Sequence, residues 1–252
     1  MKSLPLLWLF LLAMPLPVNR AAVADIQDLP KPVSRTVKKI HGWTVCVDDR
    51  LLKAPNDVLG SRALELLEAK LNDIEYVVSR DRLKKLKSIT IVLDLTHGRL
   101  RAMQYHPSAS WLEEHGYSKE LAKCVHICDA ADFARARQVN EQPWVVLHEL
   151  AHAYHDQVLG FEELRILKAY EKFKQSGHGD KVLLYDGTYT RHYALTDAKE
   201  FFAEFTEAYF GLNDFFPFNR AELKTTEPEI YSLIGSIWGP IQTGSGQQGL
   251  ED

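Results

Sequence analysis

His148-Glu149-Leu150-Ala151-His152 sets two imidazoles and one carboxylate at the spacing with which a helix can build a metal site. Residues four apart on a helix lie about 6 Å apart along its axis and roughly 40° apart around it, so both histidines can reach one ion. Glu149 lies about 100° from His148 around the helix, where its carboxylate can reach a water on that ion. The stretch therefore predicts zinc held by two histidines, with Glu149 as general base. The alternative is two surface histidines that never meet a metal.

The residues around this stretch favour a helix. Pro143 suits the first turn of a helix, and the apolar residues that follow it continue past His152 at helical spacing. We expect this helix to run from Pro143 to about Leu159.

The remaining hydrophobic pattern predicts an α+β fold. We expect the candidate site helix to divide a two-lobed domain: an N-terminal lobe with a small mixed sheet and a mainly helical C-terminal lobe, with the cleft between them. Asp186-Gly187 predicts a hairpin in the second lobe. The expected helices are 56–78, 161–175, 198–210 and 227–238, and the expected strands are 89–93, 103–106 and 124–128.

The N-terminus is typical of an exported protein. An apolar run and the small residues Ala21 to Ala24 predict a signal peptide over residues 1–24, cleaved after Ala24, and prolines within the run argue against a membrane anchor. Residues 25–40 lack periodicity and are expected to form an extended leader, followed by one domain over 41–240 and a flexible tail over 241–252. The mature chain is thus predicted to be secreted and to have no stable membrane anchor.

Composition narrows the class of partner. The net charge of −4 becomes −6 when the signal peptide is removed with its two basic residues, which does not indicate nucleic-acid binding. A hydrophobic fraction of 46% is enough for one large core.

Cys46, Cys124 and Cys128 permit one disulfide in an exported chain, with Cys124 and Cys128 as the nearer pair, and a metal-binding role for that pair is the alternative.

A catalytic zinc ion usually takes a third protein ligand. His155 lies about 10 Å along the helix from His148, too far to share the ion, so we interpret it as a surface or second-shell residue. The metzincin pattern would need glycine at position 155 and histidine at position 158, where this chain has His155 and Val158. His178 and His192 remain open as ligands.

Glu200 is the stronger candidate for the third ligand. It lies in a predicted helix capped by Thr196, and Glu200, Glu204 and Glu207 fall near one another on one face, while aromatic residues fill the rest. A solvated acidic face is the alternative. This alternative is less favoured because placing an acidic side chain among many aromatic residues removes it from water, which costs free energy.

Two blocks of sequence resemble the gluzincin metallopeptidases, in particular the catalytic domain of the anthrax lethal-factor type. The first is His148 to Tyr154, and the second runs from Tyr193 to Glu204, with Tyr193 seven residues before Glu200 as in that family. The resemblance covers roughly residues 140–210. It implies a zincin-like fold, with zinc held by His148, His152 and Glu200, Glu149 as base, Tyr193 near the substrate carbonyl oxygen, and Glu204 orienting a ligand histidine.

The expected function is that of an exported zinc metallopeptidase acting on a peptide or protein substrate. Tyr185 and Tyr189 compete with Tyr193 for the role of oxyanion donor. Strand addition at a sheet edge would bind the peptide, and Val125 to Cys128 is the candidate edge, with an ordinary internal strand as the alternative. Two other functions stay open: a zinc-bearing exported binding or structural protein without catalysis, and a zinc amidohydrolase acting on a non-peptide amide.

Overall fold

The computed structural model describes residues 28–135 and 141–241. The predicted signal peptide with its cleavage site and the first residues of the predicted leader lie outside these ranges, as does all but the first residue of the predicted tail.

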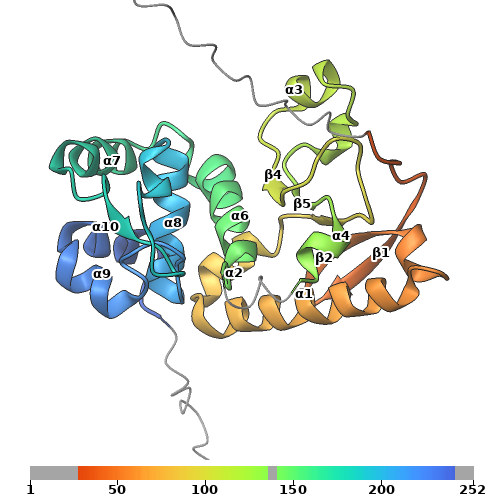
Figure 1. Ribbon diagram of the computed structural model, residues 1–252, viewed down its shortest axis with the longest axis horizontal. Coiled ribbons are helices and arrows are strands. Elements are labelled where there is room, and N and C mark those ends of the chain that lie inside the picture. The colour runs from red at the N-terminus through yellow and green to blue at the C-terminus, as the bar shows by residue number, and fades with distance from the viewer. Residues whose placement is uncertain (1–27, 136–140, 242–252) are drawn as a thin grey trace, which may run out of the picture.

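A five-stranded mixed sheet forms one side of the molecule (Figure 1). Its strand order is β1-β2-β3-β5-β4, in which β2, β3 and β5 are parallel and the two outer strands, β1 and β4, pair antiparallel to their neighbours. The strands are β1 (Arg35–Ile40), β2 (Trp43–Asp48), β3 (Ile91–Leu93), β4 (Gln104–Tyr105) and β5 (Val125–Ile127). A separate hairpin pairs β6 (Val182–Leu183) with β7 (Tyr189–Thr190), on either side of the turn expected at Asp186-Gly187.

Helices make up most of the remaining regular structure. Those of the first half are α1 (Asp57–Val77), α2 (Arg80–Leu86), α3 (Ala109–Glu114) and α4 (Ala130–Phe133), with short 3-10 turns at Asp49–Leu52 and Lys119–Leu121. Those of the second half are α6 (Val145–Tyr154), α7 (Leu164–Ser176), α8 (Ala198–Phe210), α9 (Arg220–Thr226) and α10 (Pro228–Trp238), with a π-helical turn at His155–Leu159 and a 3-10 turn at Tyr193–Leu195.

The main core lies on one face of the sheet. Alternate side chains of β2, among them Trp43 and Val45, join the apolar stripe of α1 in one buried cluster. Gly60 lets α1 approach the preceding turn closely, because a Cβ at this position would lie 1.9 Å from the backbone oxygen of Leu51. A smaller cluster, built on Val92 and Leu112, fills the opposite face.

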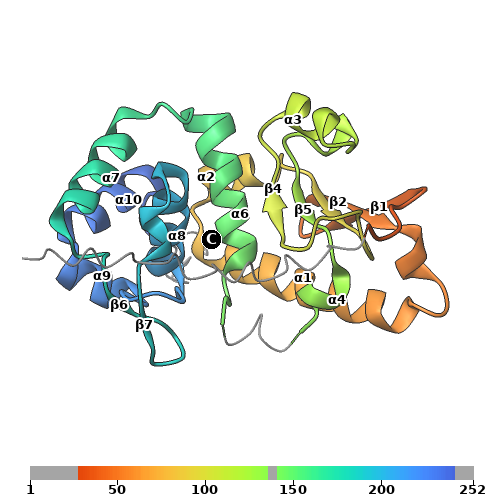
Figure 2. The ribbon, with the colours of Figure 1, turned by 45° about the horizontal axis from the view of Figure 1, so that its top comes forward.

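Helix α6 runs between the sheet and the helical half of the chain (Figures 1 and 2). All ten of its residues are buried, because it contacts α8 on one side and α1, α2, β4 and β5 on the other. Helix α8 is the centre of the helical lobe, and Phe201, Phe202 and Phe205 are fully buried on it. The mixed α/β fold and the central position of α6 agree with the sequence prediction.

Several elements differ from the sequence prediction. Residues Arg35–Ile40, expected in the leader, form the edge strand β1, so that part of the domain prediction is wrong. The strand has only two apolar residues, Val37 and Ile40, which do not alternate with polar ones, and none of its residues is buried, so the sequence carries little hydrophobic signal for it. The elements β2, α2, α3 and α9 were also missed.

Cys124 and Cys128, the nearer pair for the one disulfide that the sequence permits, are free thiols. Both cysteines flank β5, and four residues of extended chain separate Cα atoms by about 13 Å, whereas a disulfide needs less than about 7 Å. Cys46 is also a free thiol. Short separation in sequence was misleading because the chain between the two cysteines is a strand.

None of the helices in the described ranges has the length and apolar character needed to cross a membrane.

Candidate metal centre

Helix α6 supplies the first three side chains of the site. His148, Glu149 and His152 are 6%, 8% and 9% exposed, so all three are held in the interior on the expected helix. The rings of the two histidines are perpendicular, and their Nε2 atoms lie 3.1 Å apart. One turn of α6 therefore aims both imidazoles at a single point, as the spacing predicted.

Helix α8 brings the third donor. Its N-cap is Asp197, whose side chain accepts hydrogen bonds from the backbone N–H groups of Lys199 and Glu200; the expected cap, Thr196, lies one residue too early. Glu200 Oε2 lies 3.0 Å from His148 Nε2 and 3.3 Å from His152 Nε2. The predicted ligands His148, His152 and Glu200 thus converge on one point from two helices.

This geometry fits a zinc ion. Zinc bonds to imidazole nitrogen and carboxylate oxygen at about 2.0–2.2 Å, and a tetrahedral arrangement at that distance separates two ligand atoms by roughly 3.3 Å. The three donor atoms of His148, His152 and Glu200 lie close to that separation. A fourth position remains for water because the group contains three protein donors.

The charges at this point favour a cation. Burial lowers the pKa of His148, but hydrogen bonds to Glu200 and Glu207 outweigh that effect and raise the pKa well above its usual value. Burial raises the pKa of Glu200, and the two histidines more than compensate and hold it well below its usual range. The site therefore stabilises positive charge between the imidazoles and the carboxylate, which is what a bound divalent ion requires.

A second glutamate on α8, Glu207, orients His148. The Nδ1–H of His148 donates to Glu207 Oε1 at 2.7 Å, whereas Glu204 Oε1 lies 3.6 Å from the same nitrogen. The prediction gave this role to Glu204, but the hydrogen bond belongs to Glu207. Glu207 stands two helical turns after Glu200, so the spacing of the acids could have indicated it.

Glu204 belongs to a buried group of acids behind His148. Glu204 and Glu207 are fully buried, and Asp214 is 6% exposed. Burial, followed by the charge of Glu207, raises the pKa of Glu204 well above its usual value and that of Asp214 to about 7. Burial therefore favours the protonated form of Glu204, and the hydrogen bond from His148 Nδ1 goes to Glu207.

Glu149 faces a cavity of about 460 Å³ between the two lobes, where a cleft was expected. The cavity wall includes His148, Glu149, His152, Glu200 and Tyr193. Burial raises the pKa of Glu149, and the backbone N–H of Tyr105 donates to its Oε2 at 2.7 Å. A carboxylate with a raised pKa beside a metal site suits proton transfer.

Tyr193 lies in the same cavity wall as Glu200, with 47% of its surface exposed. Burial of its phenol and the nearby charge of Glu200 raise its pKa, so the hydroxyl keeps its proton and can donate a hydrogen bond. The competing residues Tyr185 and Tyr189 are not part of the described lining of this cavity.

The other histidines lie away from the three donors. His155, interpreted as a surface or second-shell residue, is fully buried between Phe161 and Phe202, so the surface alternative is wrong. His178 is exposed and contacts Glu227. His192 is buried and accepts a hydrogen bond from the backbone N–H of Ala194, so neither histidine left open as a ligand is one of the three donors.

The sheet edge beside the cavity also differs from the prediction. Strand β5, the candidate edge, is an internal strand, as in the alternative interpretation, because β3 and β4 pair with its two sides. Strand β4 is the edge, and both of its residues, Gln104 and Tyr105, line the cavity.

Comparisons of this chain with protein-family models, with curated proteins and with solved structures found no match.

Removal of the Glu207 carboxylate is expected to weaken zinc binding. Glu207→Gln keeps the size of the side chain but loses the charge that orients His148, and loss of such a partner typically weakens metal affinity by about 10- to 100-fold. The measurement is competition for zinc with a chromogenic chelator, with the exposed Glu171→Gln as the control. Equal affinities of the two variants would contradict the role given to Glu207.

Proposed function

We propose that this protein is an exported zinc metallopeptidase that hydrolyses peptide bonds with Glu149 as general base. The proposal rests on the convergence of His148, His152 and Glu200 within 3.3 Å of one another beside the carboxylate of Glu149. The resemblance of the two sequence blocks to the gluzincins adds support, as does the predicted signal peptide.

The chemistry assigned to zinc follows from its three ligands. Zinc held by His148, His152 and Glu200 would lower the pKa of a bound water and polarise the scissile carbonyl group. Glu149 accepts the proton of the attacking water and passes it to the leaving amine, a transfer for which its buried position and raised pKa are suited. Tyr193 donates a hydrogen bond to the oxygen that gains negative charge.

The substrate is proposed to bind along strand β4. An edge strand can pair with an extended peptide through free main-chain groups on its open side, as in strand addition; the Tyr105 N–H is not one of these groups, because it already donates to Glu149 Oε2. Gln104 and Tyr105 lie in the wall of the cavity that contains Glu149, so a peptide on this edge passes the candidate metal centre.

The test combines metal analysis with cleavage of an unbiased peptide library by the mature protein. Glu149→Gln is expected to keep zinc near one equivalent and to lower turnover by about 10²- to 10⁴-fold, because it removes the base and leaves the ligands in place. The exposed Glu162→Gln serves as the matched control and should behave as wild type.

The outcomes of this assay separate the rival functions. Bound zinc with no cleavage of any peptide would contradict the peptidase and favour a binding protein or an amidohydrolase for a non-peptide amide. Cleavage that survives Glu149→Gln would contradict the base, and a chain that binds no zinc would contradict the metal centre.

Tyr193→Phe tests the oxyanion donor. Loss of one such hydrogen bond typically costs about 10²- to 10³-fold in kcat, and zinc content should not change because Tyr193 is not a ligand. Tyr189→Phe is the control, since Tyr189 lies outside the described cavity wall. Full activity of Tyr193→Phe together with loss of activity in Tyr189→Phe would reverse the assignment.

A further inference from the structure

The position of Glu149 depends on strand β4. The hydrogen bond to its carboxylate comes from the main chain of Tyr105, so substitution of the tyrosine side chain leaves the donor itself in place. The position of β4 therefore determines the geometry of this hydrogen bond. Because β4 has two residues and pairs with one neighbour, its ladder is short, and further contacts must hold it.

The first anchor ties β4 back to the helix that carries Glu149. The hydroxyl of Tyr105 donates to Asp156 Oδ2 at 2.6 Å and accepts from Gln157 Nε2 at 3.1 Å. Asp156 and Gln157 lie in the π-helical turn that continues α6 directly. Tyr105 therefore contacts this continuous helical segment twice, with its N–H at Glu149 and its hydroxyl seven residues further along.

Burial of Tyr105 and the charge of Asp156 stabilise the hydrogen bond between them. Tyr105 is 7% exposed, and burial together with the Asp156 carboxylate raises its pKa far above the usual value, so its hydroxyl stays a donor. Lys123, in the loop before β5, also contacts Asp156 Oδ2 at 2.5 Å. Asp156 thus joins the end of the α6 segment to both β4 and the chain that leads into β5.

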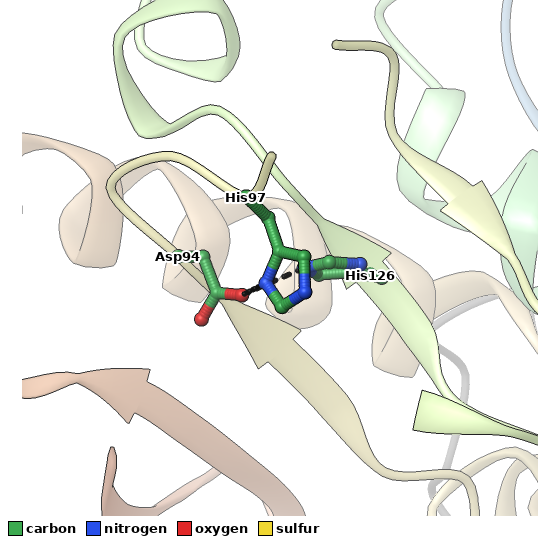
Figure 3. A group of neighbouring side chains, drawn as sticks. All are labelled: Asp94, His97 and His126. Carbon is green, nitrogen blue, oxygen red and sulfur yellow. Dashed lines mark hydrogen bonds and ion pairs between the residues drawn. The ribbon is translucent and has the colours of Figure 1, made fainter. Parts of the chain in front are cut away.

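The second anchor is a buried network of histidines around Asp94 (Figure 3). Arg35 donates to both oxygens of Asp94 at 2.7 Å and keeps this carboxylate ionised. His97 Nδ1 and His126 Nε2 lie 2.7 and 2.8 Å from Asp94 Oδ2 and donate to it. With its proton on Nε2, His126 can accept on Nδ1, and His106 Nε2 donates there at 3.1 Å.

This network fixes the residue after β4. His106 directly follows Tyr105, and its ring is bound through His126 to a carboxylate that follows β3. The same three groups, Asp94, His97 and His126, have the donor types of a metal site, but Arg35 already neutralises Asp94 and occupies both of its oxygens. We therefore interpret the network as a set of hydrogen bonds that holds β4 in place.

We propose that Tyr105 is a positioning residue for the reaction: through Asp156 on one side and the His106–His126–Asp94 chain on the other, it sets the Glu149 carboxylate. This inference rests on the proposed peptidase function. Tyr105 acts through its main-chain N–H on the base, so its side chain affects the reaction only by holding β4 in place.

The test uses zinc-loaded full-length variants and steady-state kinetics. Tyr105→Phe keeps the ring and removes the hydroxyl, and a shift of β4 is expected to lower kcat by roughly 10- to 100-fold, since misplacement of a catalytic group by about 1 Å has effects of that size. Zinc content is expected to stay at one equivalent. Tyr231→Phe, in the helical lobe, is the matched control.

A double-mutant cycle separates positioning from general loosening of the fold. Asp156→Ala should lower kcat at least as much as Tyr105→Phe, because it also removes the contact with Lys123, and the double variant should lose no more than Asp156→Ala alone, because both substitutions remove the same hydrogen bond. Asp156→Asn keeps an acceptor for the hydroxyl and is expected to restore most of kcat. Fully additive losses, or wild-type kcat in folded Tyr105→Phe, would overturn the proposal.

Crystal structures of zinc-loaded wild type and Tyr105→Phe make the test independent of activity. In the variant, the proposal predicts that the Glu149 carboxylate no longer lies within hydrogen-bond distance of the main-chain N–H of residue 105. An unchanged contact would overturn it. A wild-type protein without Glu149-dependent cleavage would instead refute the proposed function, and the two failures are thereby distinguished.

Discussion

The packing of α6 against α8 is the contact on which the rest of the molecule depends. Both helices are buried along almost their whole length, and each carries ionisable side chains into that burial. Charges in a protein interior are costly unless they are paired, so the two helices must meet in a register that pairs them. His148 on α6 pairs with two acids of α8: its Nε2 contacts Glu200, and its Nδ1 contacts Glu207. The sheet lobe then closes over Glu149 from the other side, through the main chain of β4.

The site is therefore built on packed helices on one side and on a short strand on the other. The three proposed ligands come from helices packed into one core that contains Phe201, Phe202 and Trp238. Glu149 instead takes its partner from a two-residue strand. In our account the metal is held by the packing of helices, whereas the base depends on the side chains that anchor that strand.

Features with a local cause were predictable from the sequence. The helix that carries His148 and His152 follows from apolar spacing within a few turns, and Glu200 follows from the second block. Features that depend on contacts between distant segments were not. Which acid reaches His148 is decided by the rotation of α8 against α6, so Glu204 was chosen where Glu207 makes the bond. The order of β3, β5 and β4 likewise arises from pairing between distant segments, and the edge was assigned to the wrong strand. The burial of His155 was likewise not predictable, because Phe202, one of the two rings that pack against it, comes from a distant part of the chain.

The most direct test of the central claim is X-ray absorption at the zinc edge on the purified zinc-loaded protein, compared with Glu200→Ala. The account predicts a shell of nitrogen and oxygen atoms at about 2.0–2.2 Å, with the signature of two imidazoles and no sulfur, and loss of one oxygen ligand or of the metal in the variant. Sulfur in the shell would place the zinc at the cysteines instead. A shell that Glu200→Ala leaves unchanged would show that α8 does not supply the third ligand, and either result would contradict the account.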